Sequence, residues 1–470
     1  MENKKLEKFI NDIKGKKVAV LGIGISNLPA IKYLVSIGAK VSARDKKDKL
    51  PDNLNELKAL DIEFVLGDNY LEGLEKYDYI FRSPGVKPFV YEIEKAVEVG
   101  TILTSEIEKV IELAPCKVIG ITGSDGKTTT TTLVTKFLEQ AGYKVWTGGN
   151  IGTPLFSKLD EMRKEDIVVL ELSSFQLMTL GKSPDIAIVT NISPNHLDYH
   201  RSYEEYTSAK SNIFLNQVEN NILVLNKDNN FTQKYLCLIE RRNIKTNIRA
   251  FSIEDGVVKG VFLKNGYIVS NVSGKNEKIC EIKDVKLVGM HNLANICAAA
   301  TAVYDLVNKE DIKDIVTTFG GVEHRMELVR KKDNVKWYND SIGTSPTRTI
   351  AGLKSFDDKV ILIAGGYDKN IPYEPLAPYI IKKVKQLILI GKTATKIRSA
   401  VLNESKEKKI DIDDLPEMVE FNTLEECVSY ANKIANEGDI VVMSPASASF
   451  DMYKNFEERG EHFKRLVSKL

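Results

Sequence analysis

A glycine-rich loop between a strand and a helix is the feature that most constrains the fold of this 470-residue chain. The apolar run Lys117–Thr122 predicts a buried strand, and it leads into Gly123-Ser124-Asp125-Gly126-Lys127-Thr128-Thr129. Apolar residues at helical spacing follow the loop. Backbone N–H groups of such a loop, together with the start of the helix, bind phosphate groups. The unit therefore predicts an α/β nucleotide-binding sheet. Because Ile121 stands where the longest form of this motif has its first glycine, a chance glycine-rich turn is the alternative.

Three side chains in or near this loop have the chemistry that a nucleotide and its metal require. Lys127 supplies a cation near the β- and γ-phosphates, and the Thr128 hydroxyl is a candidate Mg²⁺ ligand. Glu171 follows the apolar run Val168–Leu170, so its carboxylate is predicted at the end of a buried strand, where it could hold the same metal. Alternatively, Glu171 is only an acid at the start of a helix.

Runs of short apolar strands alternating with helices begin three times along the chain, which is typical of parallel α/β sheets. The first run contains Gly22-x-Gly24-x-x-Asn27 with Asp45 twenty-one residues beyond Gly24, a weak dinucleotide-binding fingerprint. The stretch from about 250 to 288 has short β-rich pieces and predicts an antiparallel appendage. We therefore expect three α/β domains: a Rossmann-like domain over 1–105, a central P-loop domain over 106–321 and a Rossmann-like domain over 322–470.

Composition excludes several classes of protein. The 66 Lys and Arg balance 65 Asp and Glu, so no broad basic surface for a nucleic acid or an anionic membrane is expected. The five cysteines are widely spaced and form no C-x-x-C pair, which argues against a disulfide framework or a zinc ribbon. Because the N-terminus lacks the apolar run of a secretory signal and no segment has eighteen apolar residues, we expect a cytoplasmic protein.

The segment Asn191–His200 contains two of the five histidines of the chain and follows a predicted strand. His196 and His200 are therefore candidates for a functional role, although a single histidine is more often structural.

Further motifs occur in order along the whole chain. They are Ser83-Pro84-Gly85, Gly148-Gly149-Asn150-Ile151-Gly152, Glu171-Leu172-Ser173-Ser174-Phe175-Gln176-Leu177, Ala209-Lys210, Gly289-Met290-His291-Asn292-Leu293-Ala294-Asn295, His324-Arg325-Met326-Glu327, Asn339-Asp340-Ser341, Ser444-Pro445-Ala446-Ser447-Ala448-Ser449 and Lys454-Asn455-Phe456-Glu457-Glu458-Arg459-Gly460. Together with the glycine-rich loop, these motifs resemble the Mur ligase family, ATP-dependent amide-bond ligases of bacterial cell-wall synthesis.

The resemblance implies a binding role for residues of all three domains. The UDP end of the substrate would be bound by Ile25, Ser26, Asp45 and Gly85, with Asn150 contacting its sugar or reacting arm. ATP would be bound by Ser124, Asp125, Gly126, Lys127, Thr128, Thr129 and Thr130, by Asn292 and Asn295 near adenine, and by His324, Arg325 and Asp340.

The resemblance also implies two Mg²⁺ ions, one on Thr128 and Glu171 and the other on His196 and Lys210. The family counterpart of Lys210 is carbamoylated, which makes physical sense because an ammonium group has no lone pair for a metal whereas a carbamate is an anionic oxygen ligand. Without the modification, Lys210 would be an ordinary exposed helical lysine.

The implied reaction activates a carboxylate as an acyl phosphate, which an amine then attacks. The C-terminal motifs favour the family members that add D-glutamate to UDP-N-acetylmuramoyl-L-alanine in cytoplasmic peptidoglycan precursor synthesis, and a monomer is expected. D-Glutamate would be bound by Thr344, Lys369, Ser449 and Phe456. Ile342 departs from the pattern, because the family has a lysine at this position.

Three alternatives stay open at this point. The first is a related ligase that adds another amino acid, such as the enzymes for L-alanine or a diamino acid, or a folylpolyglutamate synthase. The second is a P-loop switch protein, which would give His196, Lys210 and Asp340 no shared purpose. The third is a nicotinamide dehydrogenase, suggested by the first domain alone.

Overall fold

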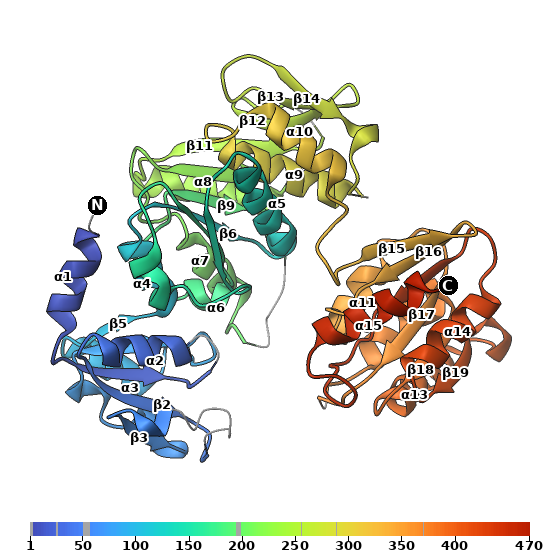
Figure 1. Cartoon of the computed structure of the whole chain (residues 1–470), viewed down its shortest axis with the longest axis horizontal. Helices are drawn as coiled ribbons and strands as arrows, with labels where there is room; N and C mark the ends of the chain where they lie inside the picture. Colours follow the sequence, from blue (N-terminus) through green and yellow to red (C-terminus); the bar gives the residue numbers. More distant parts are fainter. Residues whose placement is uncertain are drawn as a thin grey trace. The chain divides into compact units, whose positions relative to one another are not determined.

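The computed structural model describes residues 3–24, 27–49, 57–193, 199–254, 256–287, 289–369 and 371–470. It divides into two compact units, residues 1–318 and 319–470 (Figure 1). Each unit is built from α/β sheets, and the first contains two of them. The predicted fold class is therefore confirmed.

The first sheet has five parallel strands in the order β3-β2-β1-β4-β5. The strands are β1 (Lys17–Leu21), β2 (Lys40–Asp45), β3 (Glu63–Leu66), β4 (Tyr79–Arg82) and β5 (Ile102–Thr104). The helices of this region are α1 (Lys4–Ile13), α2 (Asn27–Ser36), α3 (Tyr91–Glu98) and α4 (Glu106–Leu113). Strand order reverses between β1 and β4, and open α/β sheets bind ligands at the carboxyl ends of the strands at such a point.

The second sheet has nine strands in the order β14-β13-β12-β11-β10-β9-β6-β8-β7. The strands are β6 (Lys117–Thr122), β7 (Val145–Gly149), β8 (Ile167–Glu171), β9 (Ile186–Val189), β10 (Ile222–Asn226), β11 (Asn247–Ser252), β12 (Gly260–Lys264), β13 (Tyr267–Ser270) and β14 (Glu277–Glu281). The helices are α5 (Lys127–Gln140), α6 (Ser174–Leu177), α7 (Tyr203–Ser211), α8 (Asn230–Arg242), α9 (Met290–Val303) and α10 (Lys309–Thr318). All pairs of neighbouring strands are parallel except β12 with β13 and β13 with β14, whose antiparallel pairing forms the expected appendage.

The two sheets of the first unit share one hydrophobic core. Phe156, which is fully buried, packs against the rings of Phe9, Tyr33 and Phe81, with ring centroids 6.0, 5.2 and 5.7 Å away. The Tyr33 hydroxyl also donates to Asp160 over 2.8 Å. Because a shared core transmits position, the ligand-binding edges of these two sheets are held in a defined relation.

The second unit has a six-stranded sheet in the order β15-β16-β20-β17-β18-β19. Its strands are β15 (Glu327–Lys332), β16 (Val335–Asn339), β17 (Val360–Gly365), β18 (Val384–Ile390), β19 (Glu417–Phe421) and β20 (Ile440–Met443). Its helices are α11 (Pro346–Leu353), α12 (Ala377–Lys383), α13 (Ala394–Lys408), α14 (Leu424–Ile434) and α15 (Phe456–Ser468). Every residue of β17 is buried, as expected for the central strand of a sheet covered on both faces.

Among the helices of the described residues, none combines the length and apolar character that a membrane crossing requires.

Candidate active site

The glycine-rich loop joins β6 to α5 in the second sheet, where β6 lies between strands β8 and β9. Gly123 and Gly126 have φ angles of 151° and 79°. A Cβ atom on Gly123 would lie 1.9 Å from Thr190 Oγ1, and one on Gly126 would lie 2.2 Å from Asn295 Oδ1. Both positions therefore require glycine, through backbone conformation and close approach alike. Because Asn295 belongs to α9 and also accepts from Thr130 Oγ1 over 3.3 Å, the structure brings this predicted adenine contact to the loop.

The conformation of the loop is fixed by the segment that follows β9. Ser124 N–H donates to the carbonyl of Asn191 over 2.9 Å, and Asp125 N–H donates to the side chain of Asn191 over 3.0 Å. Thr190 Oγ1 donates to the Asp125 carbonyl over 2.6 Å. The N–H groups in the first turn of α5 have no acceptor within the helix, so the loop and the helix start form an anion-binding region.

Lys127, the first residue of α5, folds back onto the loop. Its Nζ donates to the carbonyl oxygens of Gly123 and Ser124, both over 2.9 Å. The ammonium group thus lies beside the loop, which is the position expected of a phosphate-neutralising cation.

Glu171 ends β8 and is only 2% exposed. Its Oε1 accepts from Asn150 Nδ2 over 2.9 Å, and its backbone carbonyl accepts from Asn150 N–H over 2.8 Å. Within the described residues, its Oε2 is buried with no hydrogen-bond partner. A buried anionic oxygen without a donor is costly unless a cation binds it, so this carboxylate fits the predicted Mg²⁺ ligand.

Lys210, on α7, is 2% exposed rather than an exposed helical lysine. Its Nζ donates to the Gly123 carbonyl over 2.8 Å and to Thr122 Oγ1 over 3.3 Å, and it lies 4.9 Å from the Tyr206 ring centroid. Burial, and then the positive charge of Lys127, hold the pKa of Lys210 well below its usual range, against the attraction of Asp125 and Glu171. The structure thus gathers Lys127, Glu171 and Lys210 around one loop.

His200 is a buried side chain of the same region. Its Nε2 is 2.9 Å from Ser174 Oγ at the start of α6, and its Nδ1 is 3.5 Å from Glu205 Oε2. The ring stacks on Phe175 with centroids 5.5 Å apart. His196, the predicted metal ligand, lies outside the described residues.

Asp45 and Gly85 lie at the carboxyl edge of the first sheet. Asp45 Oδ2 accepts from Ile23 N–H over 2.7 Å, which fixes the loop after β1. A Cβ atom on Gly22 would lie 2.8 Å from Ser83 Cβ, so the loop that carries Gly85 is directly beside the loop after β1. The predicted UDP contacts Ile25 and Ser26 are outside the described residues.

In the second unit, His324 and Arg325 form a tight bend before β15. His324 and Met326, on either side of Arg325, have left-handed φ angles of 61° and 46°. Two carboxylates hold this bend: Glu327 Oε2 accepts from His324 N–H over 2.9 Å, and Asp340 Oδ1 accepts from Met326 N–H over 3.3 Å. Left-handed conformations are unfavourable for residues other than glycine, and they concentrate at functional sites.

Asp340 is buried at the end of β16, where its Oδ2 accepts from Ser444 Oγ over 2.6 Å. Burial raises the pKa of this carboxyl from 3.8 to about 6, and the Ser444 hydroxyl, the Met326 N–H and two arginines, Arg325 and Arg348, limit the rise. Asp340 therefore organises the arginine bend, whereas its predicted contact with ATP stays a prediction.

The predicted D-glutamate residues lie in loops and at the start of α15 in the second unit. The Phe456 carbonyl accepts from Ser341 Oγ over 2.7 Å, and Thr344 N–H donates to the Ile342 carbonyl over 2.8 Å. Ser449 is buried beside Ala448, whose carbonyl accepts from Tyr367 N–H over 2.9 Å, two residues before Lys369.

Arg459, a buried residue of α15, joins these loops. It donates to Ser341 Oγ and O over 3.0 and 2.9 Å, and to the carbonyls of Ala448 and Ser447, each over 3.1 Å. Partial burial and the charges of Arg459 and Arg348 lower the pKa of Lys369. Three cations near one another suit a ligand with more than one carboxylate.

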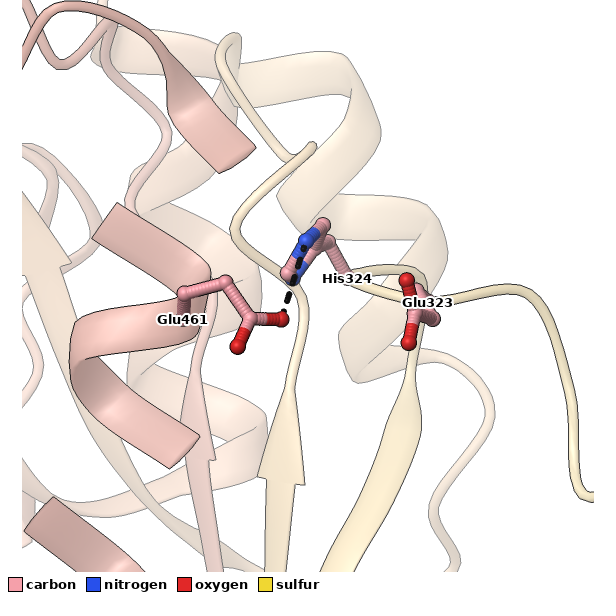
Figure 2. A group of neighbouring side chains, drawn as sticks. All are labelled: Glu323, His324 and Glu461. Atoms are coloured by element: carbon pink, nitrogen blue, oxygen red, sulfur yellow. Dashed lines mark ion pairs between the residues drawn. The ribbon is translucent and has the colours of Figure 1, made fainter. Parts of the chain in front are cut away.

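A second group of side chains that could hold a metal ion consists of Glu323, His324 and Glu461. Their ligand atoms lie within 4.8 Å of one another. Figure 2 shows Glu461 turned toward the His324 ring, with its Oε1 3.7 Å from Nε2. The Lys464 ammonium, however, lies 3.3 Å from Glu323 and 3.0 Å from Glu461. Because a protein cation already compensates these carboxylates, the group needs no metal ion.

Some residues of the site were absent from the sequence prediction. Arg459 lies within a motif that was recognised, but no role was assigned to it. Tyr206, whose hydroxyl is 2.7 Å from Ser124 Oγ, carried no signal except its spacing of four residues from Lys210 on the same helix.

Comparison with known proteins agrees with this geometry. Models of three domains match: the Mur ligase MurD-like N-terminal domain at residues 16–105, the Mur ligase middle domain at 121–303 and the Mur ligase glutamate ligase domain at 324–447. The UDP-N-acetylmuramoylalanine--D-glutamate ligase of Acetivibrio thermocellus is 51% identical over 470 residues, which cover 100% of this chain and 99% of the relative. The enzyme of the same name from Ruminiclostridium cellulolyticum is 49% identical, with 100% of each chain covered.

Solved structures give the same fold at lower identity. The UDP-N-acetylmuramate-alanine ligase MurC from Thermotoga maritima has a TM-score of 0.54 at 17% identity, covering 97% of this chain and 100% of that one. MurF from Acinetobacter baumannii also has a TM-score of 0.54, at 16% identity, covering 98% of this chain and 92% of that one. At such identities the likeness establishes the three-domain architecture alone.

Proposed function

The chain belongs to the Mur ligase family, and on that basis we propose that it joins D-glutamate to UDP-N-acetylmuramoylalanine in peptidoglycan precursor synthesis. The observation that carries the proposal is the 51% identity, over the whole chain, with a relative named for this reaction. The enzyme is an ATP-dependent ligase, as the family is, and the cytoplasm is its expected location.

The proposed reaction has two steps. A carboxylate oxygen of the substrate attacks the γ-phosphorus of ATP, the bond to the β-phosphate oxygen breaks, and ADP leaves. The D-glutamate nitrogen then attacks the acyl carbon, forming the amide bond as phosphate leaves with the electrons of the acyl C–O bond and the amine loses its proton. Such phosphoryl and acyl transfer depends mainly on positioning and on neutralising negative charge.

The residues around the glycine-rich loop are suited to the first step. We assign the triphosphate to the loop amides and the start of α5, with Lys127 as the cation nearest the transferred group. Arg325 is assigned to ATP from the second unit, together with His324 and Asp340. Asn292 and Asn295 are assigned to the adenine.

Magnesium is assigned to two positions, Thr128 with Glu171 and His196 with Lys210. When bound, Mg²⁺ would neutralise the charge of the triphosphate. The buried Oε2 of Glu171 supports the first position because it is an anionic acceptor without a donor.

The second position requires an anionic ligand at residue 210, and we propose that carbamoylation of Lys210 supplies it. The neutral amine attacks carbon dioxide, a N–C bond forms, and one proton passes to solvent, which leaves an anionic carbamate. A lowered pKa increases the fraction of neutral amine, and the neighbouring Lys127 cation favours the anionic product over the ammonium form.

D-Glutamate is assigned to Thr344, Lys369, Ser449 and Phe456. The cationic neighbourhood of Lys369, with Arg348 and Arg459, supports the assignment because it is suited to the two carboxylates of the acceptor. UDP is assigned to Ile25, Ser26, Asp45 and Gly85, and the reacting arm to Asn150. A monomer suffices, since one chain carries all of these groups.

Phosphate release tests the proposal. Purified protein is given ATP, Mg²⁺ and UDP-N-acetylmuramoyl-L-alanine with D-glutamate, L-alanine, L-lysine or a diamino acid. Release is expected with D-glutamate only, and Lys127→Ala is expected to lower it by about 10²- to 10³-fold, as loss of a charge-stabilising donor does. Lys117→Ala, an exposed lysine at the other end of β6, is the matched control and should keep full activity. Equal release with another amino acid would contradict the acceptor assignment.

A further inference from the structure

Arg82 is a buried arginine that no step of the reaction uses. It is the last residue of β4, in the first sheet, and is 1% exposed. Burial lowers its pKa to about 10, so it keeps its charge at neutral pH. Placing a guanidinium group in the interior is costly, and a buried arginine is retained when its hydrogen bonds fix a required geometry.

The hydrogen bonds of Arg82 join two domains. Its Nη1 donates to the carbonyls of Ser83 and Val86 over 3.2 and 2.7 Å, within the loop that follows β4. Its Nη2 donates to the Phe175 carbonyl over 2.8 Å and to Thr179 Oγ1 over 3.3 Å, in and just after α6 of the second sheet. One rigid, planar group therefore fixes the distance between the loop of residues 83–89 and helix α6.

A second set of contacts holds the same loop from the segment just before α7. The Tyr199 hydroxyl donates to the Pro84 carbonyl over 3.0 Å, and Arg201 Nη2 donates to the Phe89 carbonyl over 3.0 Å. The Tyr199 ring also packs on Phe175, with centroids 4.3 Å apart. Four carbonyls of the loop thus accept from Arg82, Tyr199 and Arg201.

We call the contact between the loop of residues 83–89 and helix α6 the junction. Its two sides carry different parts of the proposed site. The loop contains Gly85, assigned to the UDP end of the substrate, and it packs beside the loop after β1. Helix α6 begins three residues after Glu171, and its first residue, Ser174, contacts His200. These contacts therefore determine the position of the loop assigned to UDP relative to the phosphate-transfer centre.

We propose that Arg82 is a positioning residue that sets the position of the UDP-binding loop relative to the catalytic centre, and that Tyr199 holds the same loop. The substrate is long, and its carboxylate must arrive beside the γ-phosphate. A displacement of about 1 Å at a remote contact can lower the rate of such a step by about 10²-fold. The inference rests on the proposed function, since that function assigns the loop to UDP.

Arg44 provides a matched control. It is 4% exposed and, like Arg82, makes four hydrogen bonds in the interior of the first sheet. Its acceptors, Ser42 Oγ, the carbonyls of Tyr70 and Glu72, and the Tyr77 hydroxyl, all belong to the first domain. Loss of Arg44 therefore removes a similar amount of buried hydrogen bonding without affecting the junction.

The experiment compares Arg82→Lys with Arg44→Lys in the full-length enzyme. Melting temperature, the Kd for UDP-N-acetylmuramoyl-L-alanine from calorimetry, and steady-state kcat and KM are measured. Both variants should lose melting temperature. Arg82→Lys should lower kcat by at least about tenfold with the Kd changed by less than about threefold, whereas Arg44→Lys should keep kcat within about threefold.

Tyr199→Phe removes a single hydroxyl and gives a milder test of the same junction. It should lower kcat on its own, and its effect should be smaller in the Arg82→Lys background because the two residues act on one loop. Unchanged kcat in Arg82→Lys and Tyr199→Phe, or an equal loss in Arg44→Lys, would overturn the proposal.

One further measurement separates the proposal from the function on which it rests. Asp45→Ala should weaken the binding of UDP-N-acetylmuramoyl-L-alanine. If the Kd is unchanged in Asp45→Ala, the assignment of UDP to this edge fails and the role of Arg82 in positioning UDP fails with it, whereas weaker binding in Asp45→Ala together with unchanged kcat in Arg82→Lys and Tyr199→Phe overturns the role of Arg82 alone. If wild-type enzyme releases no phosphate with D-glutamate, the function itself fails.

Discussion

Lys127 and Lys210 donate to the same acceptor, the Gly123 carbonyl oxygen, over 2.9 and 2.8 Å. One lysine comes from α5 and the other from α7, so the fold brings two ammonium groups together at the loop assigned to phosphate. Their mutual repulsion adds to burial in lowering the pKa of Lys210. The arrangement favours conversion of one of the two lysines to an uncharged or anionic form.

We therefore predict that Lys210 reacts with carbon dioxide. Enzyme equilibrated with ¹³C-bicarbonate should give a lysine carbamate signal in ¹³C NMR, and carbon dioxide removal should lower activity until bicarbonate is restored. Lys210→Gln should lose the signal and lower activity by about 10- to 100-fold, as loss of a metal-site group does. Lys182→Gln, which changes an exposed lysine, should retain both. A fully active Lys210→Gln enzyme would rule out the modification as a requirement.

Glu171→Gln should raise the Mg²⁺ concentration needed for half-maximal activity by about 10- to 100-fold. The amide oxygen can still accept from Asn150, so the fold is kept, but the second oxygen becomes an NH₂ group that cannot bind a metal. Titration of phosphate release with MgCl₂ measures the change. Glu161→Gln, at an exposed position, should titrate as wild type does; an unchanged curve for Glu171→Gln would argue against the metal assignment.

The raised pKa of Asp340 predicts a pH dependence of stability. A carboxyl whose pKa is higher in the folded chain than in the unfolded chain stabilises the fold fully below 3.8, and this contribution is lost as pH rises through about 6. Asp340→Asn removes the ionisation, so the variant should gain about 1 kcal/mol relative to wild type between pH 5 and pH 7.5.

Urea unfolding at the two pH values measures this difference. Asp357→Asn, at an exposed carboxylate of the same unit, should show no comparable gain. If the two variants respond alike, the penalty for ionising Asp340 is not a feature of the folded protein.

Lys369→Met should raise the KM for D-glutamate by about tenfold, which corresponds to about 1.4 kcal/mol. The change removes one cation from the group formed with Arg348 and Arg459, and it should leave the KM for ATP unchanged. Lys392→Met, at another exposed lysine of the second unit, is the control. An equal effect on both substrates would indicate a general disturbance of the unit rather than a contact with the acceptor.

The sequence predicted the parts of the site that follow from strand order. In a parallel sheet the carboxyl ends of neighbouring strands meet at one edge, so the loop after β6 and Glu171 at the end of β8 were expected together. The loop glycines Gly123 and Gly126 are also recognisable in the sequence. Only glycine accommodates the close approach of Thr190 and Asn295 at these positions.

The parts that were missed depend on contacts between residues far apart in the chain. Arg82 is separated from Phe175 by 93 residues, and in the sequence it looks like an ordinary strand residue. The left-handed bend at His324 and Met326 has no glycine to mark it, because the side chains of Glu327 and Asp340 hold it. The burial of Lys210 could not be predicted from the sequence either, because a lysine on a polar helix is usually exposed.

That bend has a consequence for chemical probing of position 325. Because the backbone on both sides is held by Glu327 and Asp340, the direction in which side chain 325 leaves the chain is set without help from the guanidinium group itself. Citrulline, an uncharged analogue of nearly identical shape, could therefore be installed there by semisynthesis. The resulting enzyme would report what the arginine charge contributes, separately from its size.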